Sequence, residues 1–148
     1  MFRPPLASTN LRRGVLLVLG ATIVFLHILG YLQPNLIVGS RLVNRVAIPV
    51  LLVAALLLPR SIAVPADAWK TDPTVKWVTL VFMALGTVEV LLYAALMFNV
   101  LARFGPDYVP IDSNPTFQML ESRLGHLLVF SILGMMLSPV IVVGIRTK

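Results

Sequence analysis

The chain has 148 residues, of which 58% are hydrophobic and 12% are charged, and its formal net charge is +6. Soluble domains carry about 25% charged residues, so the composition predicts one integral membrane domain over residues 1–148, embedded in a lipid bilayer. The basic residues form no run or stripe, which argues against nucleic-acid binding. Cysteine is absent, which excludes disulfides and thiolate metal sites.

Four apolar segments are long enough to cross the membrane as helices, which takes roughly 20 residues for about 30 Å of hydrocarbon. The sequence therefore predicts an all-α, four-helix transmembrane bundle with spans at residues 14–32, 42–59, 77–101 and 124–145. The second span is the weakest, because Pro49 interrupts a short charge-free core. A proline-rich loop over residues 103–123 is expected to cap the outer end between the third and fourth helices.

Basic residues at the edges of the spans indicate the orientation. The N-terminal segment, the second loop and the C-terminal segment hold eight of them, against four in the first and third loops. The positive-inside rule then places both termini in the cytoplasm. The first and third loops would lie at the outer face.

The only two histidines lie in the first and fourth predicted helices. His27 and His126 would each sit on the order of 5–10 Å inside the outer boundary, given the rise of an α-helix. An ionisable group at membrane depth is costly and by default indicates a function. We therefore expect a polar layer near the outer face to which all four helices contribute. Its other expected members are Tyr31, Arg45, Asn99 and Arg123.

One hypothesis for this layer is an electron-transfer bundle that holds haem b between His27 and His126. Imidazole nitrogens on facing helices are ordinary axial ligands of haem iron. Arg45 and Arg123 would pair with the haem propionates. Two glycines on the first helix would let the flat macrocycle approach its backbone, namely Gly20 and Gly30.

A second hypothesis is a membrane enzyme or carrier for a lipophilic small molecule. Glu121 and the loop residue Asp112 would stand above His126, and a histidine–carboxylate pair at the mouth of an apolar cavity can move protons. The expected lining of the substrate pocket adds Tyr31, Tyr93, Asn99 and Asp112.

Glu89 lies near the centre of the third predicted helix, with Thr87 beside it and Tyr93 one turn later. A carboxyl group at that depth must be protonated, paired or in contact with water, and no Lys or Arg lies at the same depth to pair with it. The sequence predicts a neutral Glu89 that is hydrogen-bonded to a threonine or tyrosine across the bundle. The functional alternatives are a proton relay, a cation site or a polar anchor inside a ligand pocket, with Glu89 as a catalytic residue.

The function expected first is that of an accessory or complex subunit, in contact with partner membrane subunits or with further copies of itself. The haem bundle and the site for a lipophilic molecule are the alternatives. A subunit of this kind predicts small residues on the outer face of one helix, since such residues let helices approach closely in membranes. Motifs of nucleotide-binding proteins, zinc proteases and serine hydrolases are absent, and no metal site is expected.

Overall fold

The structure, a computed structural model, describes residues 9–104 and 115–147, with side chains described for 10–99 and 118–147. The described residues form helices and no strands, which confirms the all-α prediction. The four long helices are α1 (Thr9–Leu32), α3 (Ile48–Ile62), α5 (Pro73–Phe104) and α6 (Pro115–Arg146). The connecting segments contain α2 (Asn35–Val38), the π-helical turn η1 (Val43–Ala47) and α4 (Ala68–Thr71).

Four helical segments in the described part of the chain are long and apolar enough to cross a membrane. They are Asn10–Leu32, Val43–Ile62, Pro73–Asn99 and Gln118–Arg146. The protein is therefore a multi-pass membrane protein. The last two helices begin earlier than predicted because Pro73 and Pro115 are their first residues, where a helix needs no N–H group. Residues 118–123, expected in a loop, thus belong to α6, and Asp112 lies outside the described residues.

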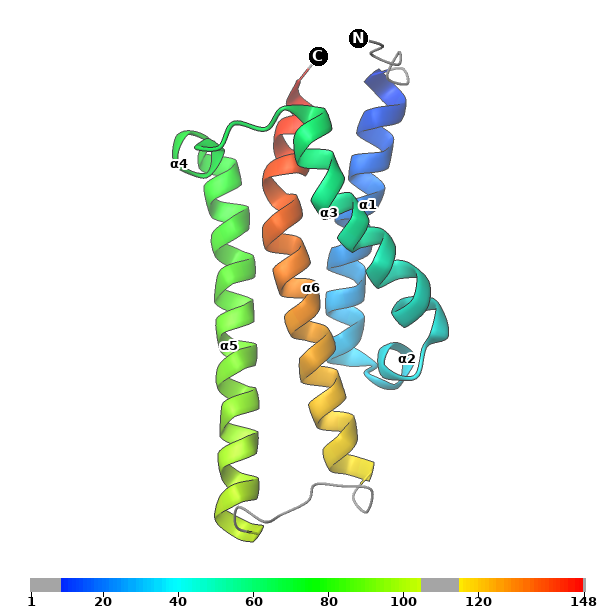
Figure 1. The fold of residues 1–148 in the computed structure, drawn as a ribbon, viewed down its shortest axis with the longest axis vertical. Helices are drawn as coiled ribbons and strands as arrows, with labels where there is room; N and C mark the ends of the chain where they lie inside the picture. The colour runs from blue at the N-terminus through cyan, green and yellow to red at the C-terminus, as the bar shows by residue number, and fades with distance from the viewer. Residues whose placement is uncertain (1–8, 105–114, 148) are drawn as a thin grey trace.

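Helix α6 is the central element of the bundle and packs against α1, α3 and α5. Figure 1 shows that the start of α1 and the end of α6 lie at the same end of the molecule. At the opposite end, α5 and α6 extend well beyond the end of α1 (Figure 1).

Prolines set the shape of the segment between α1 and α3. Helix α1 ends just before Pro34, because proline disfavours helical geometry in the preceding residue. Pro49 has no N–H to donate, and just before it the N–H of Ile48 bonds the carbonyl of Val43, five residues back. The predicted interruption of the second span is therefore a turn of π-helix rather than a simple kink.

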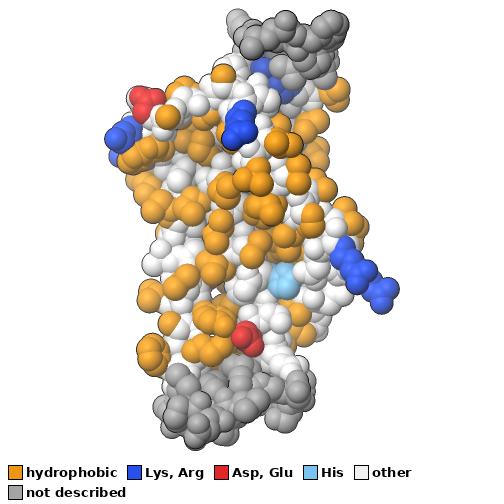
Figure 2. Space-filling view, viewed as in Figure 1, with side chains coloured by type: hydrophobic (Ala, Val, Ile, Leu, Met, Phe, Trp, Pro, Cys, Tyr) orange, Lys and Arg blue, Asp and Glu red, His pale blue; other side chains and the backbone are white. Residues whose placement is uncertain are grey.

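The apolar core lies between α1, α3 and α6 and includes Ile23, Leu51, Phe130 and Leu137. Helix α5 stands outside this core, and a large part of the molecular surface between the charged groups is hydrophobic (Figure 2). Among the described side chains of α5, only Val75 and Glu89 are buried. The one buried residue in the middle of this membrane-spanning helix is therefore a glutamate.

Candidate functional site

The carboxyl group of Glu89 is the centre of a polar cluster inside the bundle. Glu89 is only 1% exposed. The Tyr31 hydroxyl donates to its Oε1 at 3.0 Å, and the Ser131 hydroxyl donates to its Oε2 at 2.7 Å. Nε2 of His27 lies 2.9 Å from the same Oε1. Side chains from α1 and α6 thus converge on one carboxyl group of α5.

These residues meet because the long helices end at different depths. His27 and Tyr31 are four residues apart and lie on one face of α1. Glu89 lies much further from the end of α5 than His27 lies from the end of α1. Because α5 extends roughly 15 Å beyond the end of α1, the two side chains still lie at the same depth. Glu89 is therefore in contact with His27 and Tyr31 of the expected polar layer.

His27 is buried beside the carboxyl group, but its ring does not direct an N–H at it. Neither ring nitrogen forms a hydrogen bond within the described residues, although Nε2 is close enough to Glu89 for an ion pair. The ring packs against Tyr31, with 5.5 Å between centroids, and edge-on against Phe82 at 6.3 Å. Two hydroxyl donors and one imidazole ring therefore surround the carboxyl group of Glu89.

The tyrosine that binds Glu89 comes from another helix rather than from the next turn of α5. The Tyr93 hydroxyl donates instead to Oε1 of Glu121 at 3.1 Å, which links α5 to α6. Thr87 donates to the carbonyl of Met83 at 2.8 Å. The expected partner across the bundle is therefore Tyr31 of α1.

Arg123 holds the end of α1 against α6. Its Nε donates to the carbonyl of Gly30 at 3.0 Å, and its Nη2 donates to the carbonyl of Tyr31 at 2.5 Å. The last carbonyls of a helix lack partners within it and carry partial negative charge, which suits a guanidinium group. Arg123 therefore has a structural partner on the protein backbone.

His126 anchors the π-helical turn to α6. Its Nδ1 lies 2.6 Å from the carbonyl of Ser122, and its Nε2 lies 2.6 Å from Oδ1 of Asn44. The amide nitrogen of Asn44 donates to the carbonyls of Val38 and Ser40, which fixes the orientation of the amide. Both imidazole nitrogens therefore face oxygen acceptors.

The arrangement of the histidines does not support the haem hypothesis. An axial ligand must turn a ring nitrogen toward the iron, but both nitrogens of His126 are in contact with Asn44 and Ser122, and Nε2 of His27 faces Glu89. The glycine faces are also filled, since a Cβ at Gly30 would lie 2.8 Å from the side chain of Leu127 and one at Gly20 would lie 3.4 Å from Ile141. The histidines thus do not form a haem-binding pair.

The remaining candidates of the polar layer are scattered. Arg45 and Asn99 are exposed on η1 and α5. Glu121 contacts Tyr93 and not His126, so the described residues contain no histidine–carboxylate pair at the expected mouth. Of the predicted residues, the structure brings together His27, Tyr31 and Glu89. It adds Ser131, whose only signal in the sequence is a polar residue between apolar neighbours.

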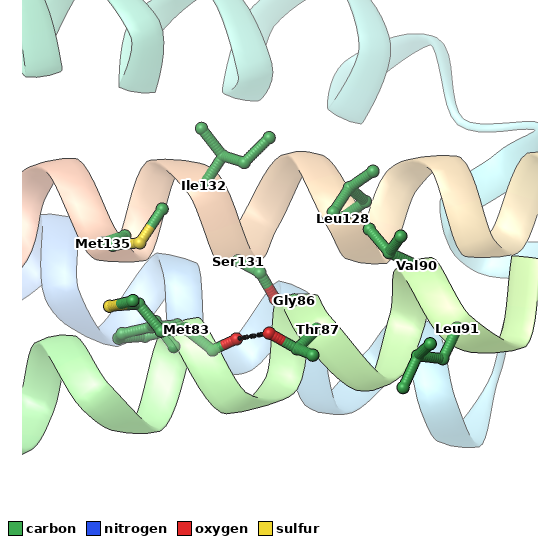
Figure 3. A pocket seen from close by; sticks show the side chains of 10 residues that line it. Met83, Gly86, Thr87, Val90, Leu91, Leu128, Ser131, Ile132 and Met135 are labelled. Atoms are coloured by element: carbon green, nitrogen blue, oxygen red, sulfur yellow. Dashed lines mark hydrogen bonds between the residues drawn. The ribbon is translucent and has the colours of Figure 1, made fainter.

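A cavity of about 330 Å³ lies between α5 and α6, next to the Glu89 cluster. Figure 3 shows Ser131 of α6 turned toward α5 at Gly86, with Thr87 beside it. Ser131 belongs both to the cavity wall and to the cluster, because its hydroxyl binds Glu89. The lining residues are Phe82, Met83, Gly86, Thr87, Val90, Leu91, Leu128, Ser131, Ile132 and Met135.

Within the described part of the chain, no group of three or more His, Asp or Glu side chains is placed to hold a metal ion. Comparisons of the chain with protein-family models, with curated proteins and with solved structures gave no match. The geometry around Glu89 and the adjacent cavity is therefore the basis for a functional interpretation.

Proposed function

We propose that this membrane protein binds a lipophilic small molecule in the α5–α6 cavity, with the Glu89 cluster as the polar contact of the site. The observation that carries the proposal is the double role of Ser131, which lines the cavity and binds the buried carboxyl group. Ligand pockets are typically about 300–1,000 Å³, mostly apolar, with a few convergent polar groups. The cavity matches this description at the lower end of the range.

Two further features support the proposal. Lining residues Met83, Val90 and Leu91 are largely exposed on the membrane-spanning part of α5, so a ligand dissolved in the bilayer has direct access. A buried ionisable side chain in a membrane is costly, and the cost is usually retained for a function. Glu89 is such a residue, and it is joined to the cavity by a single hydroxyl group.

The expectation of partner subunits or a homo-oligomer stays a prediction. The exposed face of α5 carries large side chains such as Val81, Leu91 and Phe98, rather than a stripe of small residues. Lipid tails cover such a face as well as a protein helix would. The site between α5 and α6 therefore supports ligand binding more strongly than helix docking.

Photolabelling with a diazirine-bearing decanol, in the purified protein and with two matched variants, tests the proposal. Val90 lines the cavity, whereas Val88 is equally exposed on α5 but lies outside the lining. Val90→Phe fills the cavity, and steric overlap of about 1–3 kcal/mol is expected to reduce labelling roughly tenfold. Val88→Phe should label like the natural protein. Equal labelling of both variants and the natural protein would show that the probe binds elsewhere and would refute the proposal.

A further inference from the structure

Building on the proposed function, we infer that the cavity selects neutral lipophilic molecules that carry a hydrogen-bond donor, such as an alcohol or a phenol, and that Glu89 sets this preference. The cavity wall contains two hydroxyl groups, and the direction in which each donates its proton determines which ligands can bind. Those hydroxyl groups belong to Ser131 and Thr87.

Both hydroxyl protons point away from the cavity. A serine or threonine hydroxyl has one proton to donate and two lone pairs that accept. Ser131 donates to Oε2 of Glu89 at 2.7 Å, and Thr87 donates to the carbonyl of Met83 at 2.8 Å. The oxygens that remain for a ligand can only accept. A ligand with a donor group therefore gains a hydrogen bond that a ketone or ether cannot form.

The rest of the lining restricts the charge of the ligand. None of the residues that line the cavity is charged. An ionised phosphate or carboxylate would lose its hydration there without a compensating partner, which is strongly unfavourable. Phospholipids and ionised fatty acids are thus excluded as head-first occupants, and a neutral compound with a hydroxyl group remains.

Glu89 determines the direction of the Ser131 hydrogen bond. With glutamate at position 89, Oε2 accepts the Ser131 proton, and this holds the proton away from the cavity. Oε1 accepts from the Tyr31 hydroxyl, so an amide at residue 89 that keeps this hydrogen bond places its NH2 group at the Oε2 position, facing Ser131. Its hydrogen bond would turn the Ser131 proton toward the cavity. The hydroxyl groups of Thr87 and Tyr93 on α5 donate to Met83 and Glu121 instead. Only the Ser131 hydrogen bond is therefore expected to reverse when residue 89 changes.

Glu89→Gln produces that donor without changing the shape of the side chain. The test measures how well 2-decanol and 2-decanone displace the diazirine-bearing decanol, with each competitor corrected for its partition into micelles. In the natural protein, 2-decanol should compete roughly two- to tenfold better, as one net hydrogen bond implies. In Glu89→Gln the ketone gains a donor, so the ratio should fall toward one. Glu121→Gln, which alters a carboxyl group bonded to Tyr93 and remote from the cavity, should keep the natural ratio.

Ser131→Ala provides a second test that does not depend on Glu89. Removal of the hydroxyl should also lower the ratio, with Thr87 as the remaining acceptor, while labelling by the probe persists. An unchanged preference for the alcohol in both Ser131→Ala and Glu89→Gln would overturn the inference and leave the proposed binding site intact. If neither competitor displaces the probe and Val90→Phe labels like Val88→Phe, the proposed function itself fails.

Discussion

At the scale of single residues, Asp72 shows how a charged side chain outside the membrane-spanning segment stabilises a helix end. Its Oδ1 accepts hydrogen bonds from the N–H groups of Thr74 at 2.8 Å and Val75 at 3.2 Å, and Arg146 donates to its Oδ2 at 2.6 Å. Partial burial raises the pKa of Asp72, but the hydrogen bonds from Val75, Thr74 and Arg146 outweigh it and hold the pKa below its ordinary value of 3.8.

This lowered pKa predicts a dependence of stability on acid. Because folded Asp72 binds its proton more weakly than the unfolded chain does, its contribution is present above the ordinary aspartate pKa and is lost as the pH falls through the folded value. Asp72→Asn should therefore reduce the thermal midpoint in detergent at neutral pH and have a smaller effect near pH 3. Asp67→Asn is the control, since Asp67 is exposed. Equal losses for Asp72→Asn at both pH values would contradict the assignment.

The sequence singles out His27, Tyr31 and Glu89 as candidate residues but does not predict that they contact one another. His27 and Glu89 stood out because ionisable groups are rare in apolar segments, and this signal is independent of the fold. Their pairing depends on how far α5 extends beyond α1, which composition and periodicity do not specify. Ser131 gave no comparable signal, because a serine in a membrane helix can bond its own backbone at little cost.

At the scale of the helices, close contact between α5 and α6 depends on glycine. A Cβ at Gly134 would lie 2.4 Å from ring atoms of Phe82, which also packs edge-on against His27. A Cβ at Gly125 of the same helix would meet nothing within 4 Å. The two glycines thus form a matched pair for testing the packing of α5 on α6.

Gly134→Ala should displace the Phe82 ring and destabilise the protein by about 1–3 kcal/mol, as overpacking does. Gly125→Ala should be neutral or stabilising by up to about 1 kcal/mol, because alanine favours helix more than glycine does. Unfolding in mixed micelles measures both changes. Equal stabilities of the two variants would show that α5 does not pack on α6 as described.

The helices themselves were largely predictable. The four apolar segments correspond to the four candidate spans, since length and hydropathy alone identify them. Apolarity alone predicts later starts for α5 and α6, because the residues just after Pro73 and Pro115 are partly polar. In both cases proline occupies the first position of a helix, the one place where it is favourable.

At the scale of the whole molecule, the buried carboxyl group joins three parts that the chain keeps far apart. Tyr31 belongs to α1, Glu89 to α5 and Ser131 to α6, and the hydrogen bonds between them cross the bundle. Since α5 has few other buried side chains, the cluster also positions one wall of the cavity. Binding in the cavity and the state of Glu89 are therefore expected to depend on each other.

Infrared difference spectroscopy of Glu89 tests this dependence most directly. Addition of 2-decanol to the natural protein should shift the carboxyl vibrations of Glu89. The reason is that the Ser131 hydroxyl, which donates to Oε2 of Glu89, also accepts the hydrogen bond of the alcohol. The shift should disappear in Glu89→Gln and in Ser131→Ala, and it should persist in Glu121→Gln. A spectrum that stays unchanged in the carboxyl region while the alcohol demonstrably occupies the cavity would contradict the account.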